Sequence, residues 1–158
     1  MPRVATLAFL CVLSACQARG ASPAPAPGDA ALHDVTVRVP GALRVARALD
    51  TLSVEIDPAA SADTTVHVDP GMVLGVESET RVFAAGDAHA LDERHGYTSG
   101  ASFDVGTEVW KLPQPGKRYV AEMTLTLFET DITPRHMWDP HAGRYKALLT
   151  RTLRQAEE

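Results

Sequence analysis

Cysteine is scarce in this 158-residue chain, which contains only two, and negative side chains outnumber positive ones by a small margin. Two cysteines exclude a disulfide-rich scaffold and a zinc site built from four thiolates. A formal net charge of −5 gives no electrostatic reason to bind nucleic acid, which favours basic surfaces, so we expect no nucleic-acid partner. The apolar run over residues 4–13 is shorter than the roughly 20 residues that a membrane-spanning helix needs.

Sequence signatures of several enzyme classes are also missing. The chain has no Gly-x-Ser-x-Gly elbow, no Gly-rich nucleotide loop, no Walker lysine and no His-Glu-x-x-His helix. Paired carboxylates occur at Asp92 and Glu93 and again at Glu129 and Asp131, but two nearby acids are common on an acidic surface. We therefore expect a non-enzymatic protein without a cofactor, and a cell-wall hydrolase is the least favoured alternative.

The N-terminus of the chain is its most informative segment. Met1-Pro2-Arg3 precedes the apolar run, as a short basic start precedes the core of a secretory signal peptide. Leu13-Ser14-Ala15-Cys16 follows, and this tetrapeptide resembles the lipobox of bacterial lipoproteins. The resemblance implies a signal peptide over residues 1–15, removed before Cys16, and attachment of lipid to the Cys16 thiol. Cys11 would then be discarded with the signal peptide.

Lipidation also implies where the mature protein is anchored. Gln17 stands where Asp would favour retention in the inner membrane, so lipoprotein sorting rules imply the periplasmic face of the outer membrane. Alternating Ala and Pro over residues 21–27 excludes a helix, because proline lacks an amide donor and restricts the preceding residue. We expect a lipidated cysteine and an extended tether over residues 16–32, and one domain over residues 33–158.

Apolar and polar side chains alternate from His33 onward, which is typical of half-buried strands. Residues 42–49 fit a helix or a strand equally. Residues 144–156 favour a strand, although a helix fits almost as well and the tail over 154–158 has helix-forming composition. The alternation predicts further strands over residues 35–39, 52–56, 66–68, 72–76, 81–84, 103–112 (with a bulge near Gly106 and Trp110 in the core) and 119–127.

About seven short strands separated by Gly and Pro turns predict an all-β domain. We expect a single β-sandwich that resembles immunoglobulin-like or transthyretin-like domains in pattern, with a short C-terminal helix as a variant. The Cys…Trp…Cys arrangement of antibody-type domains is absent from the sequence, so the pattern indicates no specific family.

One connection is unusually long and carries apolar side chains among polar ones. It follows Glu129, reads DITPRHMWDPHAG, and contains Ile132, Met137 and Trp138. Long loops in compact domains are often functional, and Trp and Met are enriched in the cores of interfaces. A second polar loop is expected over residues 92–100, with Tyr97 at its centre. These four residues are the predicted contact site for an envelope protein, and a glycan is a weaker candidate. The alternative is that Met137 and Trp138 cap one end of the sandwich.

Histidine and methionine offer a second hypothesis, because the chain contains six His and four Met. Imidazole and thioether groups bind copper or zinc. The spacing does not match the longer His/Met array of periplasmic copper chaperones, so solvated loop histidines are favoured, and His67 is expected on the surface. The alternative is a copper or zinc site formed by His136, Met137, His141, His89 and His95.

Overall fold

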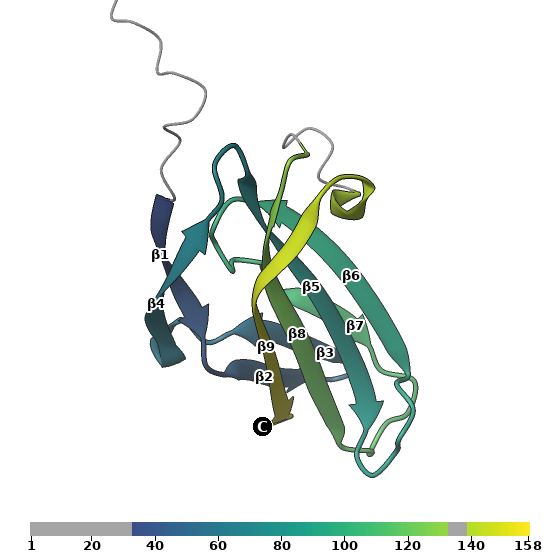
Figure 1. Cartoon of the computed structure of the whole chain (residues 1–158). Helices are drawn as coiled ribbons and strands as arrows, with labels where there is room; N and C mark the ends of the chain where they lie inside the picture. Colours follow the sequence, from purple (N-terminus) through teal and green to yellow (C-terminus); the bar gives the residue numbers. More distant parts are fainter. Residues whose placement is uncertain (1–32, 133–138) are drawn as a thin grey trace, which may run out of the picture.

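The computed structural model describes residues 33–132 and 139–158, which form nine strands and two single-turn 3-10 helices (Figure 1). Neither helix is long and apolar enough to cross a membrane. The strands are β1 (His33–Pro40), β2 (Leu43–Ala48), β3 (Thr51–Ile56), β4 (Ser61–Val68), β5 (Val73–Ala84), β6 (Asp92–Ser99), β7 (Glu108–Lys111), β8 (Tyr119–Thr130) and β9 (Tyr145–Ala156), and the helices are η1 (Pro58–Ala60) and η3 (Pro140–Ala142).

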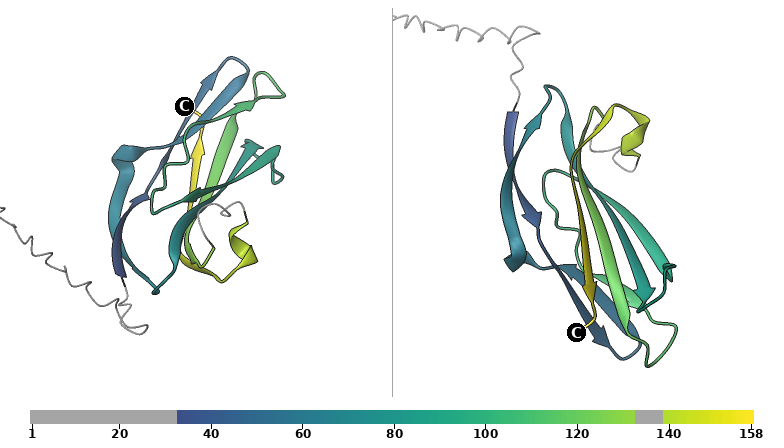
Figure 2. Two further views of the ribbon diagram at one scale, coloured as in Figure 1. Left: turned by 90° about the horizontal axis from the view of Figure 1, so that it is seen from above. Right: turned by 60° about the horizontal axis from the view of Figure 1, so that its bottom comes forward.

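The strands form an antiparallel sandwich, which confirms the predicted fold class. One sheet has the order β2-β3-β7 and the other β6-β5-β8-β9, while β1 and β4 pair as a separate two-stranded ribbon. Figure 2 shows β8 and β9 in one layer and β2 and β3 in the other. The strand order matches an immunoglobulin-like sandwich. The three-stranded sheet corresponds to strands A, B and E, in the order β2, β3, β7. In the other sheet β5, β8 and β9 correspond to strands C, F and G, and β6 extends this sheet beside strand C.

Alternating apolar side chains from all three sheets meet in one core. Trp110 is buried there, as predicted, and His67 lies exposed on β4 beside Asp34, also as predicted. The two main sheets contribute, among others, Leu52, Val54, Trp110, Val76, Tyr119, Met123, Leu125 and Leu127, and the ribbon adds Val37, Val39, Val66 and Val68. Burial of this continuous apolar surface is the main force that holds the layers together.

Several predicted elements need correction. Residues 92–100 are not a loop: residues 92–99 form β6, which pairs with β5 from Gly75 to Val82. The predicted strand over 103–112 is regular only in β7. Gly106 lies in the irregular segment before it, with φ 74°, and its amide donates to the Asp104 side chain. The short strands expected over 72–76 and 81–84 are parts of the single strand β5.

The two ambiguous segments are both strands. Residues 43–48 form β2, because pairing with β3 buries Leu43 and Val45. The prediction of a short C-terminal helix is wrong, since β9 pairs with β8 along its whole length and buries Leu153. Tertiary pairing therefore overrides the helix-forming composition of the tail.

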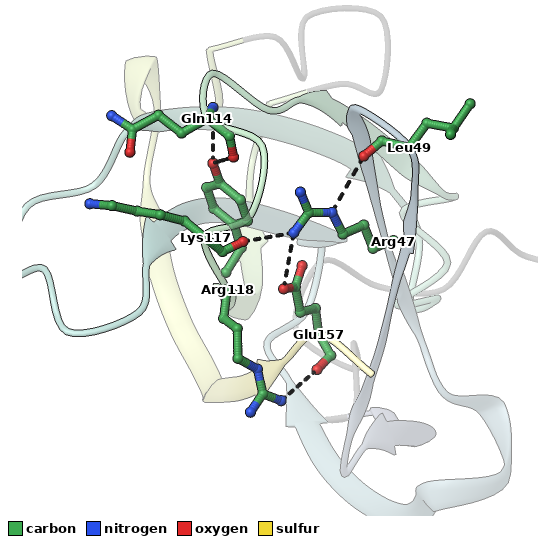
Figure 3. Close-up of polar contacts among 7 residues, drawn as sticks. Arg47, Leu49, Gln114, Lys117, Arg118 and Glu157 are labelled. Atoms are coloured by element: carbon green, nitrogen blue, oxygen red, sulfur yellow. Dashed lines mark hydrogen bonds and ion pairs between the residues drawn. The ribbon is translucent and has the colours of Figure 1, made fainter.

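Hydrogen bonds fix the chain end and the start of β8 at one end of the sandwich. Tyr119 is fully buried, and its hydroxyl donates to the carbonyl of Gln114 at 2.9 Å and accepts from the amide of that residue. This bond from a strand-start tyrosine to upstream backbone resembles the tyrosine corner of immunoglobulin-like sandwiches. Arg47 joins the carbonyl of Lys117 to the carboxylate of Glu157, as Figure 3 shows. The last residues of the chain are thus tied to β2 of the three-stranded sheet.

Candidate contact site on the four-stranded sheet

The outer face of the four-stranded sheet carries a row of polar side chains along β5 and β6. On β5, Val76, Ser78, Thr80 and Val82 are buried toward the core, so the residues that alternate with them point outward. Cross-strand pairing then sets three outward pairs side by side: Glu77 with Tyr97, Glu79 with His95, and Arg81 with Glu93. Directly opposed side chains in antiparallel sheets are close enough to interact.

Glu77 is the centre of a cluster of aromatic donors. The Tyr97 hydroxyl donates to its Oε1 at 3.2 Å, and the Tyr145 hydroxyl donates to its Oε2 at 3.0 Å. His141 Nε2 lies 3.6 Å from the same Oε2. Burial, followed by the Glu77 carboxylate, raises the pKa of both tyrosines above the ordinary value, so both stay protonated and remain donors.

A stack of three aromatic rings packs against this cluster. His141, in η3, stacks on Tyr145 with ring centroids 4.0 Å apart, and Tyr145 stacks on Phe128 at 4.9 Å. Phe128 is fully buried and covers Gly75, where an added Cβ would lie 2.5 Å from the ring. Glycine is therefore needed at this position for the stack to sit close to the sheet.

Two polar contacts hold the ends of the long connection. The Thr130 hydroxyl donates to the carbonyl of Pro140 at 3.3 Å. Asp131 accepts from the amide of Arg144 at 2.8 Å and from its guanidinium at 3.0 Å, and these bonds lower the pKa of Asp131. Ile132 is half-buried at the start of the connection. Of the remaining predicted contact residues, Met137 and Trp138 lie outside the described residues.

Glu129, which the sequence analysis paired with Asp131, is fully buried. Its Oε1 lies 2.7 Å from the Lys146 ammonium and its Oε2 accepts from the amide of Asp69 at 2.8 Å. Lys146 also bonds to the Asp69 side chain at 3.1 Å, which lowers the pKa of Asp69, while both carboxylates raise the pKa of Lys146. Glu129 and Asp131 thus each have a cationic partner: Lys146 on β9 for Glu129, and Arg144, just before β9, for Asp131.

The predicted metal ligands are distributed over different places. His141 belongs to the Glu77 cluster, and His89 is exposed in the loop between β5 and β6. Within residues 33–132 and 139–158, one group places ligand atoms together, and it contains Glu79, Glu93 and His95. His136 and Met137 lie outside the described residues.

Sequence reasoning selected Tyr97 and His141 but missed Glu77 and Tyr145, which join them. The missed residues carried no local motif, and their proximity depends on pairing between strands far apart in the chain. The structure thus defines an immunoglobulin-like sandwich with an acidic, aromatic cluster at one end. No protein-family model, no curated protein and no solved structure matches the chain.

Proposed function

We propose that the chain is a lipid-anchored protein of the cell envelope that binds a partner protein and has no enzymatic activity. The observation that carries this proposal is the convergence of Tyr97 and His141 on Glu77. One residue comes from a strand and the other from the long connection, yet both contact the same carboxylate. Together with Ile132 and Tyr145 they form the proposed contact site.

The chemistry of this site favours a basic group on the partner. Tyrosine and histidine rings present both apolar faces and polar edges, which suits them to interface cores. The Glu77 side chain retains 24% of its exposure and carries negative charge within a chain whose net charge is −5. A lysine or arginine of the partner can pair with this carboxylate and stack on the neighbouring rings.

The membrane anchor in this proposal is the lipid on Cys16, as the lipobox resemblance implies. The described chain starts at His33, at the same end of the sandwich as η3 (Figure 1). A tether over residues 17–32 in extended polyproline geometry would span roughly 50 Å, at about 3.1 Å per residue. The contact site would therefore lie within reach of proteins embedded in the same membrane.

We propose no catalytic role for Glu129 and Asp131, because both of these carboxylates have structural partners. Glu129 is buried against Lys146, and Asp131 bonds to Arg144. These contacts support a structural role for both residues, and a cell-wall hydrolase stays the least favoured alternative.

Capture of the full-length protein with its cross-linked partners from intact membranes tests the proposal. We expect Tyr97→Ala to abolish recovery of the main partner and His141→Ala to reduce it. His89→Ala is the matched control, because His89 is an exposed histidine in the loop at the far end of β5. Trp138→Ala tests the prediction made for this residue from the sequence. Equal recovery by wild type, Tyr97→Ala and His141→Ala would show that this site is not the contact surface.

A further inference from the structure

We propose that Glu79, Glu93 and His95 form a binding site for a divalent transition-metal ion, with Zn²⁺ as the fitting ion. Each residue offers one ligand atom, and the three atoms lie within 4.8 Å of one another. One imidazole and two carboxylates are ligands that zinc takes in proteins, and three protein ligands leave a fourth position for water or a partner's side chain. This site is separate from the Glu77 cluster and does not depend on the proposed contact function.

The strand register explains why these side chains converge. Glu79 and His95 are directly opposed across β5 and β6, and Glu93 is the next outward residue on β6. Outward neighbours on adjacent strands stand close enough for long side chains to meet over one point. His95 and Glu93 are about half exposed, so an ion can enter from solvent without any movement of the backbone. Hydrogen-bonded strands are also rigid supports for ligands.

A positive charge already lies between the carboxylates. The Arg81 guanidinium contacts Glu79, and its Nε lies 3.4 Å from Glu93 Oε2. Its side chain is 43% exposed and long, so it can swing into solvent when a doubly charged ion arrives. The ion would therefore compete with Arg81 for the same two carboxylates, and this competition distinguishes the proposed site from an ordinary surface histidine.

The ligand set also predicts which ions bind. Nitrogen and oxygen ligands without sulfur follow the general order in which Cu²⁺ binds most tightly, with Ni²⁺ and Zn²⁺ below it. Mg²⁺ requires near-octahedral coordination, mostly by oxygen, and dehydrates reluctantly. We expect Zn²⁺ and Cu²⁺ to bind and Mg²⁺ at millimolar concentration not to displace them.

Calorimetric titration of the full-length protein in detergent with Zn²⁺ tests the site. We expect His95→Gln and Glu79→Gln to weaken binding more than about tenfold, because loss of a partner that only orients a metal ligand already costs about 10–100-fold. Arg81→Gln should strengthen binding about tenfold or more, because it removes the competing cation. His67→Gln is the matched control, since His67 is an exposed strand histidine beside a single carboxylate, and its affinity should equal that of wild type.

Thermal unfolding of each variant without metal, compared with that of wild type, checks that each variant retains the fold. Binding by wild type that is no tighter than millimolar, or affinities of wild type and His95→Gln that are equal, would overturn the site. An unchanged or weaker affinity in Arg81→Gln would overturn the competition on which the assignment depends.

Discussion

At the scale of single residues, the most constrained charge is the Glu129 carboxylate, which is fully buried yet paired with a half-exposed lysine. Removing one partner of a buried ion pair is strongly destabilising, because the remaining charge loses its compensation. We expect Lys146→Met to leave Glu129 with the Asp69 amide alone and to lower the urea midpoint clearly.

Lys146→Arg preserves the charge and should retain most of the stability. Lys111→Met removes an exposed lysine from β7 and serves as the matched control. If Lys146→Met and Lys111→Met unfold at the same urea concentration as wild type, the buried pair does not stabilise the fold.

Two aspartates with cationic partners, Asp69 and Asp131, give the protein a predictable response to acid. Hydrogen bonding to Lys146 lowers the pKa of Asp69, and hydrogen bonding to Arg144 lowers that of Asp131. A carboxylate whose pKa is lower in the folded state stabilises the fold above its unfolded pKa, near 4, and loses that contribution as the pH falls through the folded pKa. We expect the melting temperature to fall as the pH is lowered below about 4, and less steeply in the Asp69→Asn/Asp131→Asn double variant. Parallel curves for wild type and the double variant between pH 5 and pH 2 would contradict this.

At the scale of elements, the close contact between β5 and the ring stack is the most sensitive to side-chain size. An added Cβ at position 75 would meet the Phe128 ring at 2.5 Å, and that ring supports Tyr145. Overpacking of this kind typically costs about 1–3 kcal/mol. We expect Gly75→Ala to destabilise the domain by about that amount in chemical denaturation.

The control for this prediction is a double-mutant cycle with Phe128→Leu, which makes room for the new methyl group. The coupling between the two changes should be favourable, because the smaller side chain relieves the clash. Additive effects of the two substitutions would show that the ring and the strand do not touch in the way described.

The elements also show how far sequence reasoning reaches. Strands with one apolar face, such as β1, β3 and β8, follow directly from alternation, because one side must be buried and the other solvated. β6 was missed because its inward side is not apolar: Arg94 fills that side by stacking over the Trp110 ring, 4.0 Å from its centroid. Only pairing with β5 makes this segment a strand, and a local pattern does not contain that pairing.

The same distinction applies to the candidate site. Tyr97 and His141 were selected for their loops and residue types. Their common partner, Glu77, lies 20 residues before Tyr97 and reaches it through the pairing of β5 with β6. His141 reaches the same cluster because η3 packs against it. Likewise His95 was selected with other histidines, whereas the structure places it among carboxylates of β5 and β6. Residue types indicated what chemistry was present, and the three-dimensional pairing determined which groups share a site.

At the scale of the whole molecule, the proposed contact site and the proposed metal site lie on one face of the four-stranded sheet. Glu77 and Glu79 are successive outward residues of β5, and Tyr97 and His95 are their partners on β6. A partner seated on the Glu77 cluster would thus lie next to the open coordination position of a metal ion. Of the two sites, the Glu77 cluster lies nearer the end where the described chain begins, so the anchor would set the position of that cluster relative to the membrane.

The two cysteines provide a direct test of that anchor. The lipobox resemblance assigns the lipid to Cys16 and places Cys11 in the removed signal peptide, although both thiols lie within the same short N-terminal segment. We expect Cys16→Ser to abolish incorporation of radiolabelled palmitate in cells, because the thiol to which the lipid would attach is removed. Cys11→Ser is the matched control and should be labelled like wild type, since it changes one thiol of the signal peptide and leaves all four lipobox residues in place. Labelling of Cys16→Ser at the wild-type level would refute the lipid anchor, and equal loss of labelling in both variants would show that the two cysteines do not have the separate roles proposed here.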